Sequence, residues 1–422
     1  MNEKNVISTE LDNYIKTYGQ ISNKNAQQAI MNFDKNRTWS IITQDHRPAE
    51  KFKYGNALEI FSDATCEIDD LTEDDVNKLS SLINEYDKFQ NVKSGYWIKR
   101  TLFFNLGCCW HKLSSLYDNK AIEAFKKYLY YIVSPSSDTT YPSLTAYAFR
   151  KCNTFLYQSL INDQLNISSP TTFNDPFDCP IRVLLTLLNK GDEISSLVTQ
   201  AYNDCLKIAC FSRNRKLPYV DEEGKRQDKE KKHKNDKDEF LNELMWAHYA
   251  DSHKGICIQY NLPDYMSKLR NENGSIVSYF NDVKYSDEDL GSYSNKDAIS
   301  SEDAFFLKGK KWEYENELRF LRFDLNGKGE HETIKIPNCI EAIYFGLECS
   351  EKDKETIINI MESKNLKKSV EFYQMEFDDQ HFGQLKAVKI ETEPKFHRRA
   401  ARAHFTPFIW IEVQNLHIKI KR

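Results

Sequence analysis

Apolar side chains recur at three- and four-residue steps early in the chain, which is the spacing of one face of an α-helix. Between Thr72 and Phe89, Val76, Leu79, Leu82 and Ile83 share such a face, and acidic, amide and lysine side chains occupy the other. The pattern predicts an amphipathic helix over residues 72–89 that packs on neighbouring helices.

A second pattern predicts a pair of antiparallel helices. It consists of Leu106-Gly107-x-x-Trp110 followed by Ala121-x-x-x-Phe125. It resembles one tetratricopeptide unit, in which a small residue lets the helices approach and large residues fill the seam. Only one unit is legible, so a generic helical hairpin explains the same residues. Either arrangement predicts a helical domain over residues 1–145 that binds a protein partner or regulates the domain that follows.

The pattern changes near residues 134–142, where Pro, Ser and Thr indicate a loop at the domain boundary. Beyond it, short runs rich in Phe, Val, Ile and Tyr predict strands at 256–260, 317–323, 342–345, 370–377 and 385–390. Helices are expected at 180–206, 239–250 and 352–363. Strands mixed irregularly with helices predict an α+β domain over residues 150–422. The densely charged residues 221–239 have nothing apolar to bury and are expected to form a solvated, mobile insertion.

Composition narrows the class of protein. The chain has 422 residues, 40% of them hydrophobic and 13% aromatic, which is enough for packed cores and excludes disorder of the whole chain. The ten cysteines include no C-x-x-C pair, so neither a zinc ribbon nor a disulfide framework is predicted. The chain shows no secretory signal pattern and no apolar run long enough to span a membrane. We therefore expect a cytoplasmic protein without membrane contact.

The net charge of −5 neither favours nor excludes nucleic acid as a partner. The last segment, Lys395 to Arg422, is locally basic and carries Phe396, Phe405, Phe408 and Trp410. Basic and aromatic side chains together can hold single-stranded nucleic acid, by phosphate pairing and base stacking. A terminal strand and helix with a solvated basic face explains the same composition.

Four motifs of the second half resemble a bacterial domain family of unknown function. They are Leu156-Tyr-Gln-Ser159, Phe173-Asn-Asp-Pro-Phe-Asp178, Leu244-Met-Trp-Ala-His-Tyr-Ala-Asp-Ser-His-Lys-Gly255 and Lys311-Trp-Glu-Tyr-Glu-Asn-Glu-Leu-Arg319. In the second motif Pro176 holds Asp175 extended, which favours a rigid turn, with Asp175 or Asp178 touching a ligand as the alternative. In the third motif His248 and His253 lie five residues apart, a poor spacing for two metal ligands on a helix. We expect no metal.

The order of residues in this half also resembles the ADP-ribosyltransferase fold, which includes toxins that modify thymine bases in DNA. In those enzymes an aromatic or His residue on the first strand contacts NAD, a Ser or Thr follows on a middle strand, and a Glu near a later strand performs the chemistry. Tyr157, Ser212 and Glu317 stand in that order. Glu315 completes an E-x-E arrangement, and residues two apart in an extended segment share a face.

The resemblance implies NAD as substrate and Glu317, Glu315 and Tyr157 as catalytic residues. The residues expected to bind NAD are Ser212, Asn174, Asp175, Trp246, His248 and Tyr249. The function implied is an ADP-ribosyltransferase or NAD-consuming, toxin-like effector in anti-phage defence.

Three alternatives remain open. A nucleic-acid-binding or nucleic-acid-processing protein would use the basic tail. An interaction or sensor module would use the helical domain without chemistry. The glutamates of the fourth motif could instead pair at the surface with Lys310, Lys311, Arg319 or Arg322 and need no function.

Overall fold

The structure is a computed structural model of the chain. It describes residues 58–59, 62–63, 65–66, 69–88, 96–134, 144–175, 178, 192–213, 219–220, 226–227, 239–263, 266, 274–287, 305–364, 369–381 and 383–391. The basic tail from Lys395 to Arg422 lies outside these residues, as does most of the charged insertion at 221–239. The outcomes below concern the described residues.

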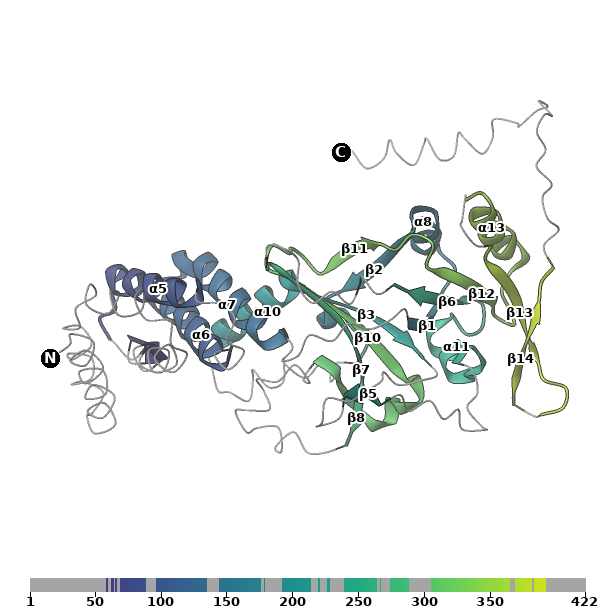
Figure 1. Ribbon diagram of the computed structural model, residues 1–422, viewed down its shortest axis with the longest axis horizontal. Helices are drawn as coiled ribbons and strands as arrows, with labels where there is room; N and C mark the ends of the chain where they lie inside the picture. The colour runs from purple at the N-terminus through teal and green to yellow at the C-terminus, as the bar shows by residue number, and fades with distance from the viewer. Residues whose placement is uncertain are drawn as a thin grey trace, which may run out of the picture.

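Helices form the first part of the described chain (Figure 1). They are α5 (Glu73–Lys88), α6 (Tyr96–Leu113) and α7 (Asp118–Val133). The amphipathic helix expected at 72–89 is confirmed by α5, in which Val76, Leu79 and Ile83 are fully buried. None of the helices in the described part of the chain is long and apolar enough to cross a membrane.

The predicted helical hairpin is confirmed by α6 and α7. Gly107 of α6 faces the ring of Phe125 on α7 so closely that a Cβ on Gly107 would lie 2.4 Å from a ring carbon. Leu106, Trp110 and Ala121 are buried in the same seam. The absence of a side chain at Gly107 therefore sets how closely the two helices approach.

A ten-stranded, mostly antiparallel sheet forms the second part. Its strands are β1 (Leu144–Arg150), β2 (Gln164–Ser168), β3 (Leu206–Ser212), β6 (Ile256–Leu262), β7 (Ile276–Asp282), β10 (Glu317–Asp324), β11 (His331–Lys335), β12 (Ile340–Phe345), β13 (Glu371–Phe377) and β14 (Leu385–Lys389). The main path runs β11-β2-β3-β1-β6-β12-β13-β14, and β10 pairs with both β3 and β7. Only β12 and β13 pair in parallel among these strands. The predicted α+β class is confirmed.

Five of these strands fall where the sequence predicted them, namely β6, β10, β12, β13 and β14. The helix expected at 352–363 is α13 (Glu351–Glu362), and the one expected at 239–250 is a 3-10 turn, Glu239–Leu241, followed by α11 (Glu243–Tyr249). The helix expected at 180–206 is described only as α10 (Asp192–Cys205), and Leu206 already begins β3.

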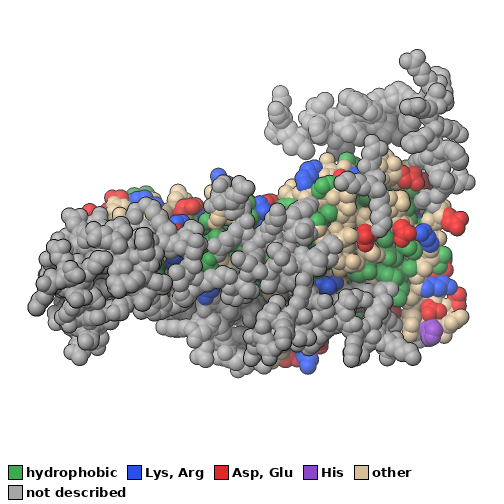
Figure 2. Space-filling model, in the orientation of Figure 1, with side chains coloured by type: hydrophobic (Ala, Val, Ile, Leu, Met, Phe, Trp, Pro, Cys, Tyr) green, Lys and Arg blue, Asp and Glu red, His purple; other side chains and the backbone are tan. Residues whose placement is uncertain are grey.

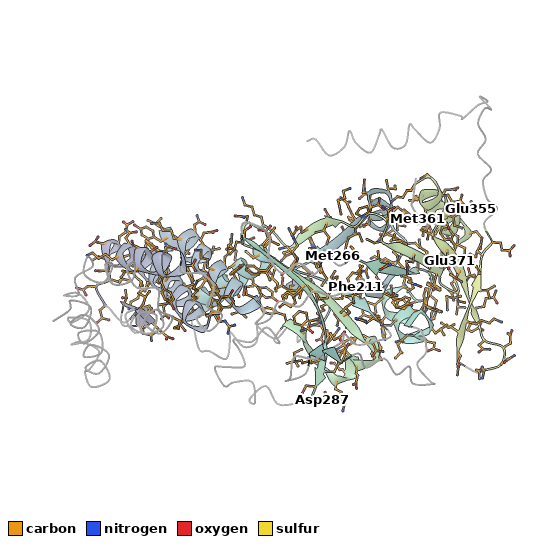
Figure 3. All side chains as sticks on the ribbon, viewed as in Figure 1. Phe211, Met266, Asp287, Glu355, Met361 and Glu371 are labelled. Carbon is orange, nitrogen blue, oxygen red and sulfur yellow. The ribbon has the colours of Figure 1, made fainter. Side chains whose placement is uncertain are left out.

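The two faces of the sheet are covered by different helices. Ala146 and Ala148 of β1 belong to the core under α8 (Thr154–Asn162) and α13. Tyr147 and Phe149 point the other way, into the core under α11. Figure 3 shows Phe211 of β3 in the interior of this part and Glu355 of α13 toward its outside. The alternation follows from the two-residue period of a strand.

One hydrophobic core joins the helices to the sheet. Leu129 of α7 and Val198 of α10 share it with Ile208 of β3 and with Leu321 and Phe323 of β10. The helix α10 follows β1 in sequence but packs against α7, as Figure 1 shows. The helical part and the sheet are therefore in direct apolar contact.

Candidate functional site

Three strands place three polar side chains in one row across the sheet. Tyr147 of β1 lies opposite Ser212 of β3, and Ser212 lies opposite Glu317 of β10. Residues directly opposite each other on neighbouring strands point to the same face. All three side chains are therefore on the face that α11 covers.

The sheet opens beside this row. The edge of β3 away from β10 pairs with β2 only at Ile208 and with β1 only at Ser212. Residues 209–211 of β3 lie between these two contacts, and a cavity of about 270 Å³ opens there. Its lining includes Tyr147, Ser212 and Glu317, and its size is close to the about 300–1,000 Å³ of ligand pockets.

The segment before β10 brings a second carboxylate to the cavity. Lys310–Glu315 is a 3-10 helix, and Asn316 has a left-handed backbone with φ 42°. The expectation that Glu315 and Glu317 share the face of one extended segment is therefore wrong, because β10 begins only at Glu317. The tight turn nevertheless directs both carboxylates to the same cation, Lys308.

Lys308, on the short strand β9 (Leu307–Gly309), is the centre of a buried ionic cluster. Its Nζ lies 2.6 Å from Glu315 Oε2, 3.3 Å from Glu317 Oε2 and 3.5 Å from Asp178 Oδ2. Burial alone would lower the pKa of Lys308, but the three carboxylates outweigh it and raise the pKa. Lys308 therefore remains charged.

Arg319 is the second cation of the cluster and is fully buried. Its Nε donates to Glu317 Oε1 at 2.7 Å, and its Nη2 donates to Asp178 Oδ1 at 2.7 Å. Its Nη1 donates to the carbonyl oxygen of Phe305 at 2.8 Å. The second motif, which ends at Asp178, is thus joined to the fourth, which ends at Arg319.

The cluster contains three carboxylates and two cations, so when all five groups are ionised it has a net charge of −1. Burial raises the pKa of Glu317, but Arg319 and Lys308 outweigh it and lower the pKa to about 2. Burial also raises the pKa of Glu315, and there the charge of Glu317 adds to the effect while Lys308 opposes it. The unbalanced negative charge therefore raises the pKa of Glu315, whereas Glu317 stays ionised.

Tyr249 of α11 completes this side of the cavity. Its hydroxyl donates to Glu315 Oε1 at 2.5 Å and also forms a hydrogen bond with Asn174. Burial and the contact with Glu315 raise the pKa of Tyr249, so the hydroxyl keeps its proton. Tyr249 can therefore serve as a hydrogen-bond donor to Glu315.

The structure brings together six of the residues that the sequence singled out. The six that line the cavity are Asn174, Asp178, Ser212, Tyr249, Glu315 and Glu317. The surface pairing considered for the glutamates is corrected in one respect. Glu317 does pair with Arg319, but both side chains are buried at the cavity.

The other four sequence-predicted residues do not line it. Tyr157 lies on helix α8, not on the first strand, and its hydroxyl donates to Asp353 Oδ1 at 2.6 Å. Trp246 of α11 is fully buried between that helix and the sheet, where its Nε1 donates to the carbonyl oxygen of Phe240. The ring of His248 lies edge-on to Tyr249 and tilted against Tyr314. Asp175 is buried.

Tyr147 and Lys308 were missed by the sequence reasoning. Strand 144–150 is buried on both faces and shows no alternation of polar and apolar residues, so it was not recognised as the first strand. The position of the aromatic residue was consequently assigned to Tyr157. The one signal for this strand in the sequence was its position directly after Pro142, at the end of the predicted boundary loop. Lys308 carries no local signal.

Within the described residues, no group of three His, Cys, Asp or Glu side chains is placed to hold a metal ion. The lining combines three carboxylates, two serines and two tyrosines with the cations Arg150 and Lys308. Around Lys308 the carboxylates outnumber the cations, so this side of the cavity suits a group that is cationic or becomes cationic during a reaction.

Residues 245–320 match a family described as protein of unknown function (DUF2971). The matched range contains Tyr249, Lys308, Glu315, Glu317 and Arg319, whereas Tyr147, Asp178 and Ser212 lie outside it. No curated protein matches the chain. No solved structure matches it either.

Proposed function

We propose that this protein cleaves the nicotinamide–ribose bond of NAD and passes the ADP-ribosyl group to water or to an acceptor. The observation that carries the proposal is the row Tyr147, Ser212 and Glu317 on neighbouring strands at one cavity. An aromatic residue on the first strand of the sheet, a serine on a middle strand and a glutamate on a later one follow the order of the ADP-ribosyltransferase fold. Tyr147 therefore replaces Tyr157, which the sequence analysis had chosen, as the aromatic residue of the first strand that contacts NAD.

The charge state of Glu317 supports the chemistry. As the bond from nicotinamide to ribose breaks, its electron pair goes to the nicotinamide nitrogen, and positive charge develops on the ribose. A fixed carboxylate in a low-dielectric site stabilises such charge by about 3–4 kcal/mol. Glu317 is ionised and held on both oxygens by Arg319 and Lys308, so it need not reorganise during the reaction.

Glu315 supplies a second role. Water or an acceptor hydroxyl that attacks the ribosyl cation must lose a proton. A carboxylate whose pKa is raised by burial is a better proton acceptor than an ordinary one. The Tyr249 hydroxyl and Lys308 hold the two oxygens of Glu315 at 2.5 and 2.6 Å and orient it toward this role.

The helices before β1 would then regulate the site, on binding a protein partner. Strands β3 and β10 carry Ser212 and Glu317 at one end. At the other end they place Ile208 and Phe323 in the core shared with α7 and α10. A shift of these helices would reach the row through two continuous strands.

On the face shown in Figure 2, acidic and basic side chains of the described residues are interspersed, and no basic patch favours nucleic acid there.

The test is to incubate the purified full chain with NAD, with and without cell extract, and to measure released nicotinamide and ADP-ribosylated products. Release that depends on Glu317 is the expected result. If no nicotinamide is released under any of these conditions, the proposal is wrong.

A further inference from the structure

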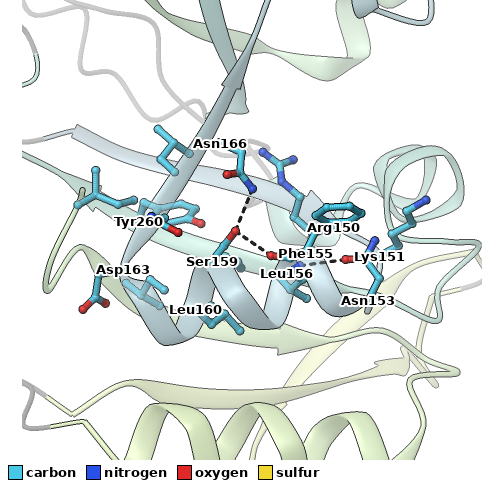
Figure 4. Close-up of a pocket in the computed structure, with 15 residues that line it drawn as sticks. Arg150, Lys151, Asn153, Phe155, Leu156, Ser159, Leu160, Asp163, Asn166 and Tyr260 are labelled. Atoms are coloured by element: carbon cyan, nitrogen blue, oxygen red, sulfur yellow. Dashed lines mark hydrogen bonds between the residues drawn. The ribbon is translucent and has the colours of Figure 1, made fainter. Parts of the chain in front are cut away.

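A second cavity lies on the opposite face of the sheet from α11. It has a volume of about 190 Å³ and is bounded by α8, β2 and β6 (Figure 4). Leu156, Leu160 and Ile258 give it an apolar floor. Its two basic side chains, Arg150 and Lys151, lie near the N-terminal end of α8 beside Phe155, and Asp163 lies at the other end of the helix (Figure 4).

The two cavities meet at two residues. Arg150, the last residue of β1, and Asn166 of β2 line both. This follows from the opening beside β3, because β1 and β2 diverge there and the first cavity is lined from both faces of the sheet. A ligand that reached from the row of Tyr147, Ser212 and Glu317 into the second cavity would therefore pass Arg150 and Asn166.

The second cavity is positively charged. Neither Arg150 nor Lys151 forms an ion pair with any carboxylate that the structure describes. Asp163, the acidic residue of the lining, is neutralised by Lys364, whose Nζ lies 2.6 Å from Asp163 Oδ1. The Nη1 of Arg150 donates to the carbonyl oxygen of Phe149 at 2.8 Å, but no carboxylate occupies the guanidinium. The planar guanidinium of arginine is the side-chain group best suited to phosphate oxygens.

Phe155 gives the rim an aromatic surface. Its side chain lies in the first turn of α8 and is 74% exposed, which is unusual for a phenylalanine. An exposed ring next to unpaired cations offers a stacking platform for a nucleobase beside a site for phosphate.

We propose that the second cavity binds a nucleoside diphosphate, with Arg150 holding the phosphates and Phe155 stacking on the base. The inference rests on the proposed function in assigning this ligand to the ADP half of NAD. It adds the second cavity as the place where the ADP half binds, and Arg150 and Phe155 as the residues that bind it.

The spacing fits one extended ligand. Arg150 follows Tyr147 by three residues on β1, which is about 10 Å at the rise of a strand. The end of β1 is also firmly held, because a Cβ on Gly255 would lie 2.2 Å from the carbonyl oxygen of Arg150. Only glycine permits this close approach, and it fixes where the Arg150 side chain begins.

The experiment is calorimetric titration of the full chain with ADP, and separately with inorganic diphosphate. Arg150→Gln should weaken ADP binding by about tenfold or more, because a hydrogen bond to a charged group is lost. Phe155→Ala should weaken ADP about tenfold and leave diphosphate unchanged, because only the stacking is removed. Lys328→Gln, which removes an exposed cation outside both cavities, is the matched control and should bind normally.

No ADP binding by the parent chain, or equal binding by all variants, would overturn the inference. Since Phe155 is exposed, its variant keeps the comparison valid even if Arg150→Gln fails to fold. ADP should also raise the KM for NAD without changing kcat. Binding that leaves KM unchanged would identify a separate nucleotide site and reject the assignment to NAD. ADP binding with the expected dependence but no nicotinamide release would instead reject the proposed function alone.

Discussion

Arg319 and Asp178 are 141 residues apart in the chain, yet one guanidinium nitrogen of Arg319 lies 2.7 and 2.9 Å from the two carboxylate oxygens of Asp178. Both side chains are buried, so this pair holds Asp178 against β10. It also positions Glu317, because the same guanidinium holds Glu317 Oε1. The stability of the cluster and the geometry of the cavity therefore depend on the same atoms.

The first prediction concerns the imbalance of charge. Arg319→Met would leave three buried carboxylates with one cation and should destabilise the protein by about 3–5 kcal/mol. Asp178→Asn would leave two carboxylates and two cations in the cluster, and it should destabilise the protein much less. Urea unfolding measures both. Lys389→Met, which breaks an exposed pair with Glu371, is the control and should leave stability nearly unchanged. Equal losses for Arg319→Met and Asp178→Asn would contradict the charge argument.

The second prediction separates catalysis from stability at Glu317. Glu317→Gln balances the cluster at two carboxylates and two cations and keeps the size of the side chain, so the melting temperature should fall by only a few degrees. Nicotinamide release should fall about a hundredfold or more, because a neutral amide cannot stabilise the ribosyl cation. Retained turnover in a folded variant would remove Glu317 from the mechanism.

The third prediction concerns pH. The pKa of Glu317 is lowered from 4.5 to about 2, so its ionised form contributes stability that is complete above pH 4.5 and is lost as pH falls toward 2. The pKa of Glu315 is raised, so its burial opposes folding at neutral pH and ceases to do so on acidification. Below pH 4.5 the parent should therefore lose more stability than Glu317→Gln. Glu315→Gln should be more stable than the parent, and the difference in stability should be largest at neutral pH. Urea midpoints at pH 7, 5 and 3 test both signs.

Much of the fold was predictable because its signals are local. The helix α5 has a regular apolar face, and β6, β10 and β12 are aliphatic and aromatic runs bounded by turn residues. Five strands of the sheet, β1, β2, β3, β7 and β11, were not predicted. Of these, β1 and β3 are buried on nearly every residue and carry no two-residue alternation. Periodicity cannot identify such a strand.

The site was predictable only in part for a related reason. Glu315, Glu317 and Ser212 were found from residue type and order, but Lys308 joins them through tertiary packing that no spacing encodes. Tyr157 was chosen because the true first strand was not recognised. The extended E-x-E segment was wrong because the left-handed backbone of Asn316 separates the two glutamates.

The fourth prediction tests the contact between α6 and α7. In Gly107→Val the new side chain would overlap the Phe125 ring, since even a Cβ lies 2.4 Å from it. The helices must separate, and stability should fall by about 1–3 kcal/mol despite the removal of a glycine from a helix. Phe125→Ala is destabilising by itself because the ring is fully buried, but the double variant should lose less stability than the sum of the two single losses, and a double-mutant cycle measures this coupling. Additive losses would show that the two residues do not meet.

The last prediction decides between two tyrosines. Tyr147 lies in the row with Ser212 and Glu317, whereas Tyr157 bonds to Asp353 on the far side of the sheet. Tyr147→Leu keeps an apolar side chain but removes the ring that would face the ligand, and it should raise the KM for NAD about tenfold. Tyr157→Phe loses one hydrogen bond, about 1 kcal/mol of stability, and should leave KM and kcat unchanged. The readout is steady-state nicotinamide release, with urea unfolding to confirm that both variants are folded. A KM that responds to Tyr157→Phe and not to Tyr147→Leu would return the role to Tyr157, and would mean that the nicotinamide end of the ligand lies on the α8 side of the sheet rather than beneath α11.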